Sequence, residues 1–198
     1  MPEQDAVVAI TSGVRDMQAV LNLVWDKLLP GMKSDPLPMD DVGDQKLHSK
    51  LASLTMPTPK SSESHQIPSD VSGKTFHFPS NPGKLEMLSL EFHQVDPVTL
   101  IMKCDGTKEC RVHCGNGEWK KGRLAFGSLG FGPLQEQPAA VCGAWTADKK
   151  YTALICFYET PYVLTLEMDF SSDKIRVDPT WNVSFGPRKP GQLVGERK

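Results

Sequence analysis

The spacing of hydrophobic and polar positions changes twice along the chain. Ala6–Ile10 form a continuous apolar run, which is typical of a strand that is buried on both faces. Apolar residues then recur at helical spacing through Met17–Leu28, and Asp16 precedes them with an oxygen that can cap the helix. A second, shorter helix is expected within residues 32–56, where three leucines share one face: Leu47, Leu51 and Leu54.

Beyond these helices, residues 57–72 are rich in Pro and Ser and hold few side chains that could form a core. This composition is typical of a linker that crosses a surface. The sequence therefore predicts three zones. Residues 1–56 hold the strand, the helix and the connector helix, residues 57–72 are the linker, and residues 73–198 form a second domain.

From Gly73 onward the chain consists of short strand-like runs separated by turns, and no helical spacing recurs. Asp105-Gly106, Asn116-Gly117 and Asp148-Lys149 are typical of hairpin turns, so successive strands should pair antiparallel. We expect a mainly β fold, an antiparallel, lipocalin-like β-barrel of about 8–10 strands, preceded by the N-terminal strand and two α-helices. The expected strands are Lys74–Phe78, Leu85–Phe92, Val98–Cys104, Glu109–Cys114, Glu118–Phe126, Ala139–Thr146, Tyr151–Tyr158, Tyr162–Phe170, Lys174–Asp178 and Trp181–Phe185.

Composition limits the classes of partner. The 198 residues carry a net charge of -2, so nothing favours general binding to nucleic acid or to an anionic membrane. No apolar run approaches the roughly 20 residues of a membrane-spanning helix, and no leader peptide with a cleavage site is recognisable. The sequence assigns the chain to no cellular compartment.

The opening strand and helix need a partner. A single buried strand with one amphipathic helix has no sheet to join and leaves its edges unpaired. Residues 1–31 are therefore predicted to pack against a domain that lies upstream, or against another copy of the chain in a homodimer.

Several segments resemble a known family. Pro2–Pro30 is similar to the last strand and helix of the catalytic domain in serine hydrolases of the class C β-lactamase and penicillin-binding-protein superfamily. The resemblance implies a non-catalytic C-terminal accessory region, whose parent is a secreted or periplasmic serine hydrolase with its catalytic machinery upstream of Met1. Four later segments resemble recurring elements of the β-domain that follows the hydrolase domain in some of these bacterial proteins: Arg111–Trp119, Gly143–Asp148, Tyr158–Pro161 and Asp178–Gly186.

None of the superfamily's three catalytic motifs can be placed on this chain. They are Ser-x-x-Lys at a helix start, Tyr-or-Ser-x-Asn, and a Lys-Thr-Gly-like strand. Ser171-Ser-Asp-Lys174 lies between two strand runs, where a hairpin turn explains it, and Lys74-Thr75 is followed by Phe76 in place of Gly. We therefore expect no catalytic residue and no hydrolysis by the chain alone.

The cysteines give only a weak signal for a metal site, for which Cys110, His113 and Cys114 are the candidates. Four residues span about 13 Å along a strand, which is too far for Cys110 and Cys114 to share one tetrahedral metal ion. Five cysteines without a paired Cys-x-x-Cys spacing favour buried thiols, with a Cys104–Cys110 disulfide or a metal site as the alternatives. No cofactor is implied.

Aromatic residues on the predicted strands are the candidates for a ligand site, because they either fill the barrel or line a pocket at its mouth. Residues 127–138 form a loop that is long enough to act as a lid or a contact arm. Three functions remain open: an accessory region of a hydrolase, a small-ligand-binding barrel with an interior cavity, and a protein-interaction or oligomerisation module. The five aromatic candidates are Trp119, Trp145, Tyr158, Tyr162 and Trp181.

Overall fold

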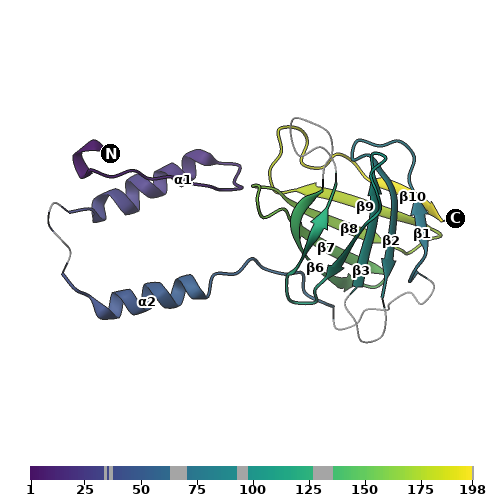
Figure 1. The fold of residues 1–198 in the computed structure, drawn as a ribbon, viewed down its shortest axis with the longest axis horizontal. Coiled ribbons are helices and arrows are strands. Elements are labelled where there is room, and N and C mark those ends of the chain that lie inside the picture. The colour runs from purple at the N-terminus through teal and green to yellow at the C-terminus, as the bar shows by residue number, and fades with distance from the viewer. Residues whose placement is uncertain (34, 36–37, 63–70, 93–97, 127–135, 198) are drawn as a thin grey trace. The chain divides into compact units, whose positions relative to one another are not determined.

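The chain divides into two compact units, residues 1–57 and 58–198. The computed structural model describes residues 1–33, 35, 38–62, 71–92, 98–126 and 136–197. Each unit is described by itself (Figure 1). In the described part of the chain, no helix is long and apolar enough to cross a membrane.

The first unit contains the two predicted helices. Helix α1 (Met17–Leu23) continues through a π-helical turn (Val24–Leu28) and a 3-10 turn (Leu29–Gly31), and α2 spans Asp41–Ala52. The cap expected at Asp16 is present, because its Oδ1 accepts a hydrogen bond of 3.0 Å from the backbone N–H of Ala19. Asp40 caps α2 in the same way, at 2.9 Å from the N–H of Gly43. A short 3-10 turn (Pro2–Gln4) precedes them.

The strand predicted for Ala6–Ile10 is not present. These residues form no β-ladder, and the side chains of Val7, Val8 and Ile10 are 94%, 37% and 43% exposed. The apolar run was interpreted as a strand buried on both faces, but within the described part of residues 1–57 there is no second strand with which it can pair. A strand needs a neighbour for its backbone hydrogen bonds, so the segment stays irregular.

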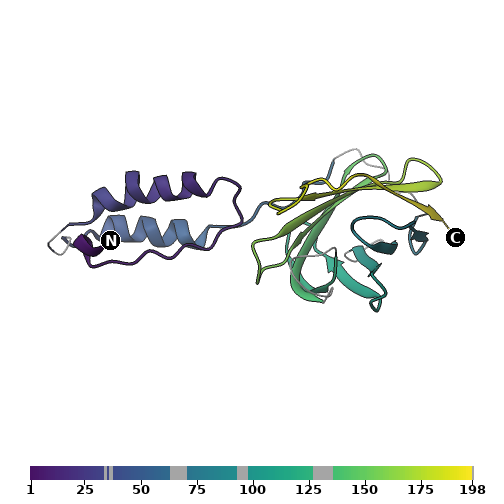
Figure 2. The same cartoon turned by 90° about the horizontal axis from the view of Figure 1, so that it is seen from above.

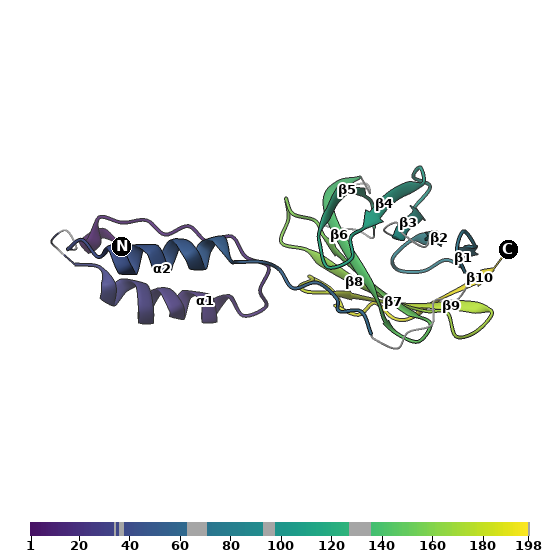
Figure 3. The same cartoon turned by 90° about the horizontal axis from the view of Figure 1, so that it is seen from below.

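The second unit is a barrel-like sheet of ten strands, all paired antiparallel, and no helix occurs among its described residues (Figures 2 and 3). The order around the sheet follows the sequence from β5 through β10 and continues from β1 to β4, since β10 pairs with β1. This nearly closed meander confirms the predicted barrel. The strands are β1 (Thr75–His77), β2 (Leu85–Glu91), β3 (Val98–Cys104), β4 (Cys110–Cys114), β5 (Lys120–Leu124), β6 (Gln137–Ala147), β7 (Lys150–Cys156), β8 (Val163–Asp169), β9 (Lys174–Trp181) and β10 (Leu193–Arg197).

The prediction at the C-terminal end of the barrel was wrong. Trp181–Phe185 is not a separate strand, because β9 runs without interruption through Pro179 to Trp181. Proline is tolerated there because β10 pairs with β9 only as far as Val177, so the end of β9 has a single neighbour. The tenth strand is instead β10, which sequence reasoning missed.

The sheet has its two edges at β4 and β5, although these strands are consecutive in the sequence. The predicted Asn116-Gly117 hairpin is therefore wrong. The chain after β4 crosses to β6, where Gly115 accepts a hydrogen bond of 2.9 Å from the N–H of Gly143 and forms an isolated parallel bridge with Cys142. The other two predicted turns do join paired strands, β3 to β4 at Asp105-Gly106 and β6 to β7 at Asp148-Lys149.

Candidate functional site

Exposed apolar side chains are concentrated in the first unit. Of the eighteen large hydrophobic residues exposed in the described part of the chain, fifteen lie in residues 1–57, and no described residue of this unit is buried. Isolated surface hydrophobics are ordinary, but so dense a set of exposed apolar side chains is unusual for a monomeric protein. We call this set the N-terminal apolar surface; it comprises Val7, Val8, Ile10, Val14, Met17, Leu21, Leu23, Trp25, Leu28, Met39, Val42, Leu47, Leu51, Leu54 and Met56.

The helices place these side chains at regular intervals. In the first helical segment, Met17, Leu21 and Leu28 follow a spacing of four and seven residues and are 72%, 41% and 44% exposed. In α2, Leu47 and Leu51 are one turn apart and are 56% and 55% exposed. Each helix therefore has a stripe of partly or largely exposed apolar side chains.

Among the predicted aromatic candidates, Trp145 fills one end of the barrel. Its side chain is 5% exposed, and its ring lies 5.6 Å from Phe92, 5.2 Å from Tyr151 and 5.9 Å from Phe170, measured between ring centroids. These edge and tilted contacts are the preferred arrangement of buried aromatic rings.

Trp181 and Tyr162 lie at the opposite end of the barrel strands, where both are half-buried. The Trp181 ring is 6.2 Å from Phe126, 6.2 Å from Phe157 and 6.1 Å from Tyr162. The barrel is thus filled by one aromatic cluster near each end, with aliphatic side chains between them.

The remaining two candidates belong to neither cluster. Tyr158 is 46% exposed, and the Lys121 ammonium lies 5.6 Å from the centroid of its ring. Trp119 is half-buried in the connection between β4 and β5. The structure therefore does not bring the five predicted aromatics together into one pocket. Residues 127–135 of the predicted lid lie outside the described residues.

Cys110, His113 and Cys114 do not converge on a metal site. The alternation of β4 places Cys110 and Cys114 on the buried face and His113 on the exposed face, where its Nδ1 is 3.1 Å from the hydroxyl of Thr99. Among the described residues, no group of three or more potential ligands could hold a metal ion. All five cysteines are free thiols, so the alternative of a Cys104–Cys110 disulfide was wrong.

Burial dominates the chemistry of these thiols. It raises the pKa of Cys114 to about 12 and that of Cys142 to about 12. At Cys110, burial and a 3.3 Å hydrogen bond from the thiol to Glu136 Oε1 also raise the pKa. Since the thiolate is the reactive form, these side chains are poor nucleophiles.

The Ser171-Ser-Asp-Lys174 sequence forms the turn between β8 and β9, as predicted. The backbone N–H of Ser171 donates to Asp169 Oδ1 at 2.9 Å, and Lys174 Nζ pairs with Glu196 Oε1 at 2.6 Å. The ammonium is therefore engaged by a carboxylate on β10, and the pair does not have the arrangement of a serine nucleophile with its base.

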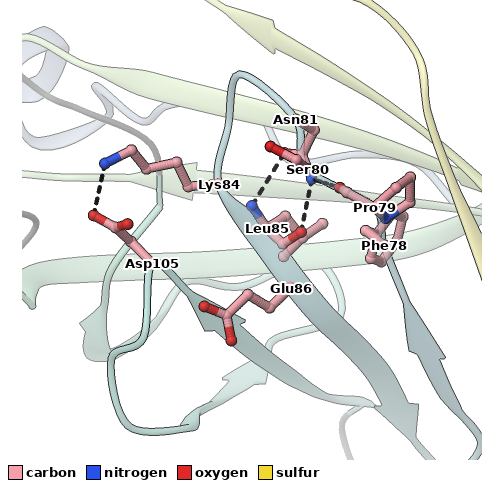
Figure 4. A pocket seen from close by; sticks show the side chains of 8 residues that line it. All are labelled: Phe78, Pro79, Ser80, Asn81, Lys84, Leu85, Glu86 and Asp105. Atoms are coloured by element: carbon pink, nitrogen blue, oxygen red, sulfur yellow. Dashed lines mark hydrogen bonds and ion pairs between the residues drawn. The ribbon is translucent and has the colours of Figure 1, made fainter.

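A surface pocket of about 290 Å³ opens beside the loop between β1 and β2 and the turn after β3 (Figure 4). Sequence reasoning did not identify it, because a sequence pattern does not show that Asp105 lies beside the loop between β1 and β2, which supplies most of the lining. None of the five aromatic candidates lines it. The lining residues are Phe78, Pro79, Ser80, Asn81, Lys84, Leu85, Glu86 and Asp105.

Several polar groups of this pocket are already paired with one another. The Asn81 amide donates to the carbonyls of Pro79 and Leu85 at 2.7 and 2.8 Å, and its oxygen accepts from the N–H of Leu85 at 3.1 Å. Lys84 Nζ lies 2.8 Å from Asp105 Oδ2 (Figure 4). A charged ligand that binds to Lys84 or Asp105 would have to compete with this ion pair.

The carboxylate of Glu86 is also engaged. It lies 2.9 Å from Lys103 Nζ and accepts a hydrogen bond from the N–H of Gly106. Both interactions favour the charged form and lower the pKa of this exposed carboxyl group. Its role in the structure is to hold the turn after β3 against β2.

Comparison with known proteins, by sequence and by fold, assigns the chain to no family. No family model matches it, and searches of curated proteins and of solved structures find no match.

Proposed function

We propose that this chain is a non-catalytic accessory region of a serine hydrolase of the β-lactamase superfamily. In this proposal residues 1–31 complete the catalytic domain, residues 32–56 connect it to the barrel, and the barrel is a structural appendage. The observation that supports the proposal is the N-terminal apolar surface, whose side chains are exposed to solvent in this chain.

The size of the exposed surface supports a stable partner. Full burial of a side chain such as valine, leucine or methionine contributes about 1.5–3 kcal/mol. Fifteen such side chains stay exposed in residues 1–57, and no described residue there is buried to offset the cost of ordering the helices. A separate domain that covers them would supply the missing stabilisation.

The arrangement of the apolar residues favours an α/β sheet as the partner surface. Val7 and Val8 are adjacent and point to opposite faces of any strand, so both faces of that strand would be buried in a layered sheet. The stripe on α1 then suits a helix that covers one face of the same sheet. This is the position that the resemblance assigns to Pro2–Pro30.

The first test of the proposal concerns hydrolysis. The chain alone should turn over neither nitrocefin nor p-nitrophenyl butyrate above the buffer rate. The genomic sequence before its first codon should encode, in the same reading frame, a domain with Ser-x-x-Lys, Tyr-x-Asn and Lys-Thr-Gly motifs. The longer protein made from that frame should hydrolyse one of these substrates.

A Leu21→Asp substitution in the longer protein should abolish hydrolysis, because it would bury a charge in the proposed interface. Lys46→Asp is the matched control, since it places the same side chain on α2 at a charged, exposed position. An upstream sequence without these motifs would remove the proposal. A stable homodimer of this chain, measured by light scattering and broken by Leu21→Asp, would favour the oligomerisation module instead.

A further inference from the structure

The Asn116-Gly117 dipeptide lies in the connection between the two edge strands of the sheet, β4 and β5. The chain has four asparagines, and Asn116 is the one that a glycine follows. An asparagine before glycine is chemically reactive, because the glycine carries no side chain that hinders the attack of its backbone nitrogen on the asparagine side-chain amide.

The structure leaves the atoms of this reaction accessible. Asn116 and Gly117 are both exposed. Among the described residues, neither the Asn116 side-chain amide nor the Gly117 backbone N–H has a hydrogen-bond partner. Gly117 has a φ of +72°, and no atom lies within 4 Å of the position that a β-carbon would take there. No described hydrogen bond therefore has to break before the Gly117 nitrogen meets the amide carbon of Asn116.

The other three asparagines are protected by their surroundings. Asn22 lies within α1, whose backbone is held by helical hydrogen bonds. Asn81 precedes a proline, whose nitrogen carries no hydrogen and cannot form the imide ring. The Asn182 amide is bonded at both ends, since its oxygen accepts from the N–H of Val163 at 2.8 Å and its nitrogen donates to a backbone carbonyl at 2.9 Å.

A second dipeptide of the same kind shows how the fold can block the attack. In Asp105-Gly106, the turn between β3 and β4, the backbone N–H of Gly106 donates to the carboxylate of Glu86. The Asp105 carboxylate is paired with Lys84 Nζ at 2.8 Å (Figure 4). The Gly106 nitrogen must give up its hydrogen bond before it can attack, which slows the reaction roughly tenfold. The chain thus carries one open and one blocked dipeptide.

We propose that Asn116 is a site of non-enzymatic deamidation. The Gly117 nitrogen loses its proton to hydroxide and bonds to the amide carbon of Asn116. The bond between that carbon and the amide nitrogen breaks, and the nitrogen takes a proton from water and leaves as ammonia. One water then opens the imide ring at either carbonyl and gives aspartate or isoaspartate. Nothing is oxidised or reduced, and this site is independent of the proposed hydrolase partner.

The position of the dipeptide gives the modification a structural effect. Gly115 ties this connection to β6, because its N–H donates to the Val141 carbonyl at 3.3 Å and its carbonyl accepts from the N–H of Gly143 at 2.9 Å. The loop that follows is compact, since a β-carbon at Gly115 would lie 2.2 Å from the Glu118 carbonyl oxygen. Isoaspartate adds one carbon to the main chain of this loop. The two hydrogen bonds to β6 should therefore weaken.

Peptide mapping by mass spectrometry tests the proposal on the full chain. The chain is incubated in mildly alkaline buffer, folded and in guanidinium chloride, and the tryptic peptide of residues 112–120 is followed for a gain of about 1 Da. The rate in the folded chain should be less than roughly tenfold below the rate in denaturant, because no hydrogen bond protects the site. Protection of tenfold or more, or no conversion, would overturn the proposal.

Asp105→Asn supplies the matched comparison, because it creates a second asparagine before glycine in the same chain. Asparagine tolerates the φ of 47° at this position. Conversion there should be slower in the folded chain than in denaturant by roughly tenfold or more, since the Gly106 N–H stays bonded to Glu86. Adding Glu86→Ala should remove this protection and leave the rate at Asn116 unchanged. Equal protection of the two dipeptides would show that the fold does not select Asn116, and it would refute the inference.

A last comparison tests the effect on the connection between the edge strands. Asn116→Asp carries the same added charge as the modified chain without the extra main-chain carbon, so its Tm should equal that of the parent chain. The isoaspartate form, separated by anion exchange and recognised by its resistance to the protease Asp-N, should have a Tm about 2–4 °C lower. Equal Tm values for all three forms would contradict the structural effect assigned to this site.

Discussion

Replacing Gly143 by alanine should destabilise the barrel. A β-carbon at this position would lie 2.7 Å from Cζ and 2.8 Å from Cε1 of Tyr151, and closer still to the hydroxyl oxygen. Ordinary contacts between such atoms are longer than 3.4 Å. One methyl group would therefore force the tyrosine ring to move.

The ring has little freedom to move. Tyr151 is 1% exposed and is packed edge to face against Trp145, so a displacement must spread into the aromatic cluster at this end of the barrel. Overpacking of this kind costs about 1–3 kcal/mol. Alanine also lowers the conformational entropy of the unfolded chain, which offsets about 0.4–1 kcal/mol of this loss in stability. The net loss in the free energy of unfolding is thus between about 0 and 2.6 kcal/mol, with a middle value of about 1.3 kcal/mol.

Urea unfolding followed by tryptophan fluorescence measures this loss, because Trp145 reports directly on the cluster. Gly186→Ala is the matched control. Its β-carbon would meet only Ser184 Oγ, at 3.9 Å, and its backbone is outside the left-handed region. This variant should be as stable as the parent chain or slightly more stable, for the same unfolded-state reason.

Equal stability of the two variants would refute the reasoning. It would mean that Tyr151 does not lie over β6 at Gly143, and the pairing of Trp145 with Tyr151 would have to be revised. A loss of stability accompanied by a lower denaturant slope would instead indicate a change in the compactness of one state, and it would not support the steric explanation.

Three other predictions follow from the two units. Deletion of residues 1–57 should leave the Tm of the barrel unchanged in calorimetry. It should also remove most of the binding of the dye 1-anilinonaphthalene-8-sulfonate, since the N-terminal apolar surface is lost. Unfolding of the barrel after the deletion would contradict the division into units. Asn81→Ala should lower the free energy of unfolding by about 1–2 kcal/mol, because three hydrogen bonds to the β1–β2 loop are lost, whereas Ser80→Ala should have no measurable effect. The free energy of unfolding should fall as the pH rises from 9 towards 12, because the unfolded Cys114 thiol has a pKa of 9.0 and burial raises the pKa of the folded thiol to about 12. Cys114→Ala should make this fall shallower by up to about 1.4 kcal/mol per pH unit. An identical slope in the variant would contradict the raised pKa.

Much of the barrel could be predicted from its alternating side chains. β8 alternates between the two faces along its whole length, and its predicted range exceeds the observed strand by one residue at each end. β10 was missed because Gly195, Glu196 and Arg197 lack the β-branched and aromatic side chains that signal a strand. Gly195 is required by tertiary packing, since a β-carbon there would lie 2.8 Å from both Ile175 and Phe78. Such a requirement is not visible in the local sequence.

The candidate surfaces were predictable to different degrees. The exposure of apolar side chains in residues 1–31 could be expected from the sequence, because an apolar run and one amphipathic helix cannot bury each other completely; that these residues bind a partner stays a prediction. The contact between the Trp145 and Tyr151 rings depends on the register between β6 and β7, which a sequence pattern does not provide. The split of the aromatic candidates between two ends of the barrel has the same cause.

The pairing of β10 with β1 determines when the barrel can form during protein synthesis. Phe76 and Arg197 are partners, and β10 is translated after the other nine strands of the described residues. Until it leaves the ribosome, β1 and β9 both present unpaired backbone edges, which are templates for aggregation. Closure across such a sequence separation is also slow, because the loop entropy is lost before the contact forms. A stop codon before residue 193 would therefore leave the nascent barrel open and dependent on chaperones.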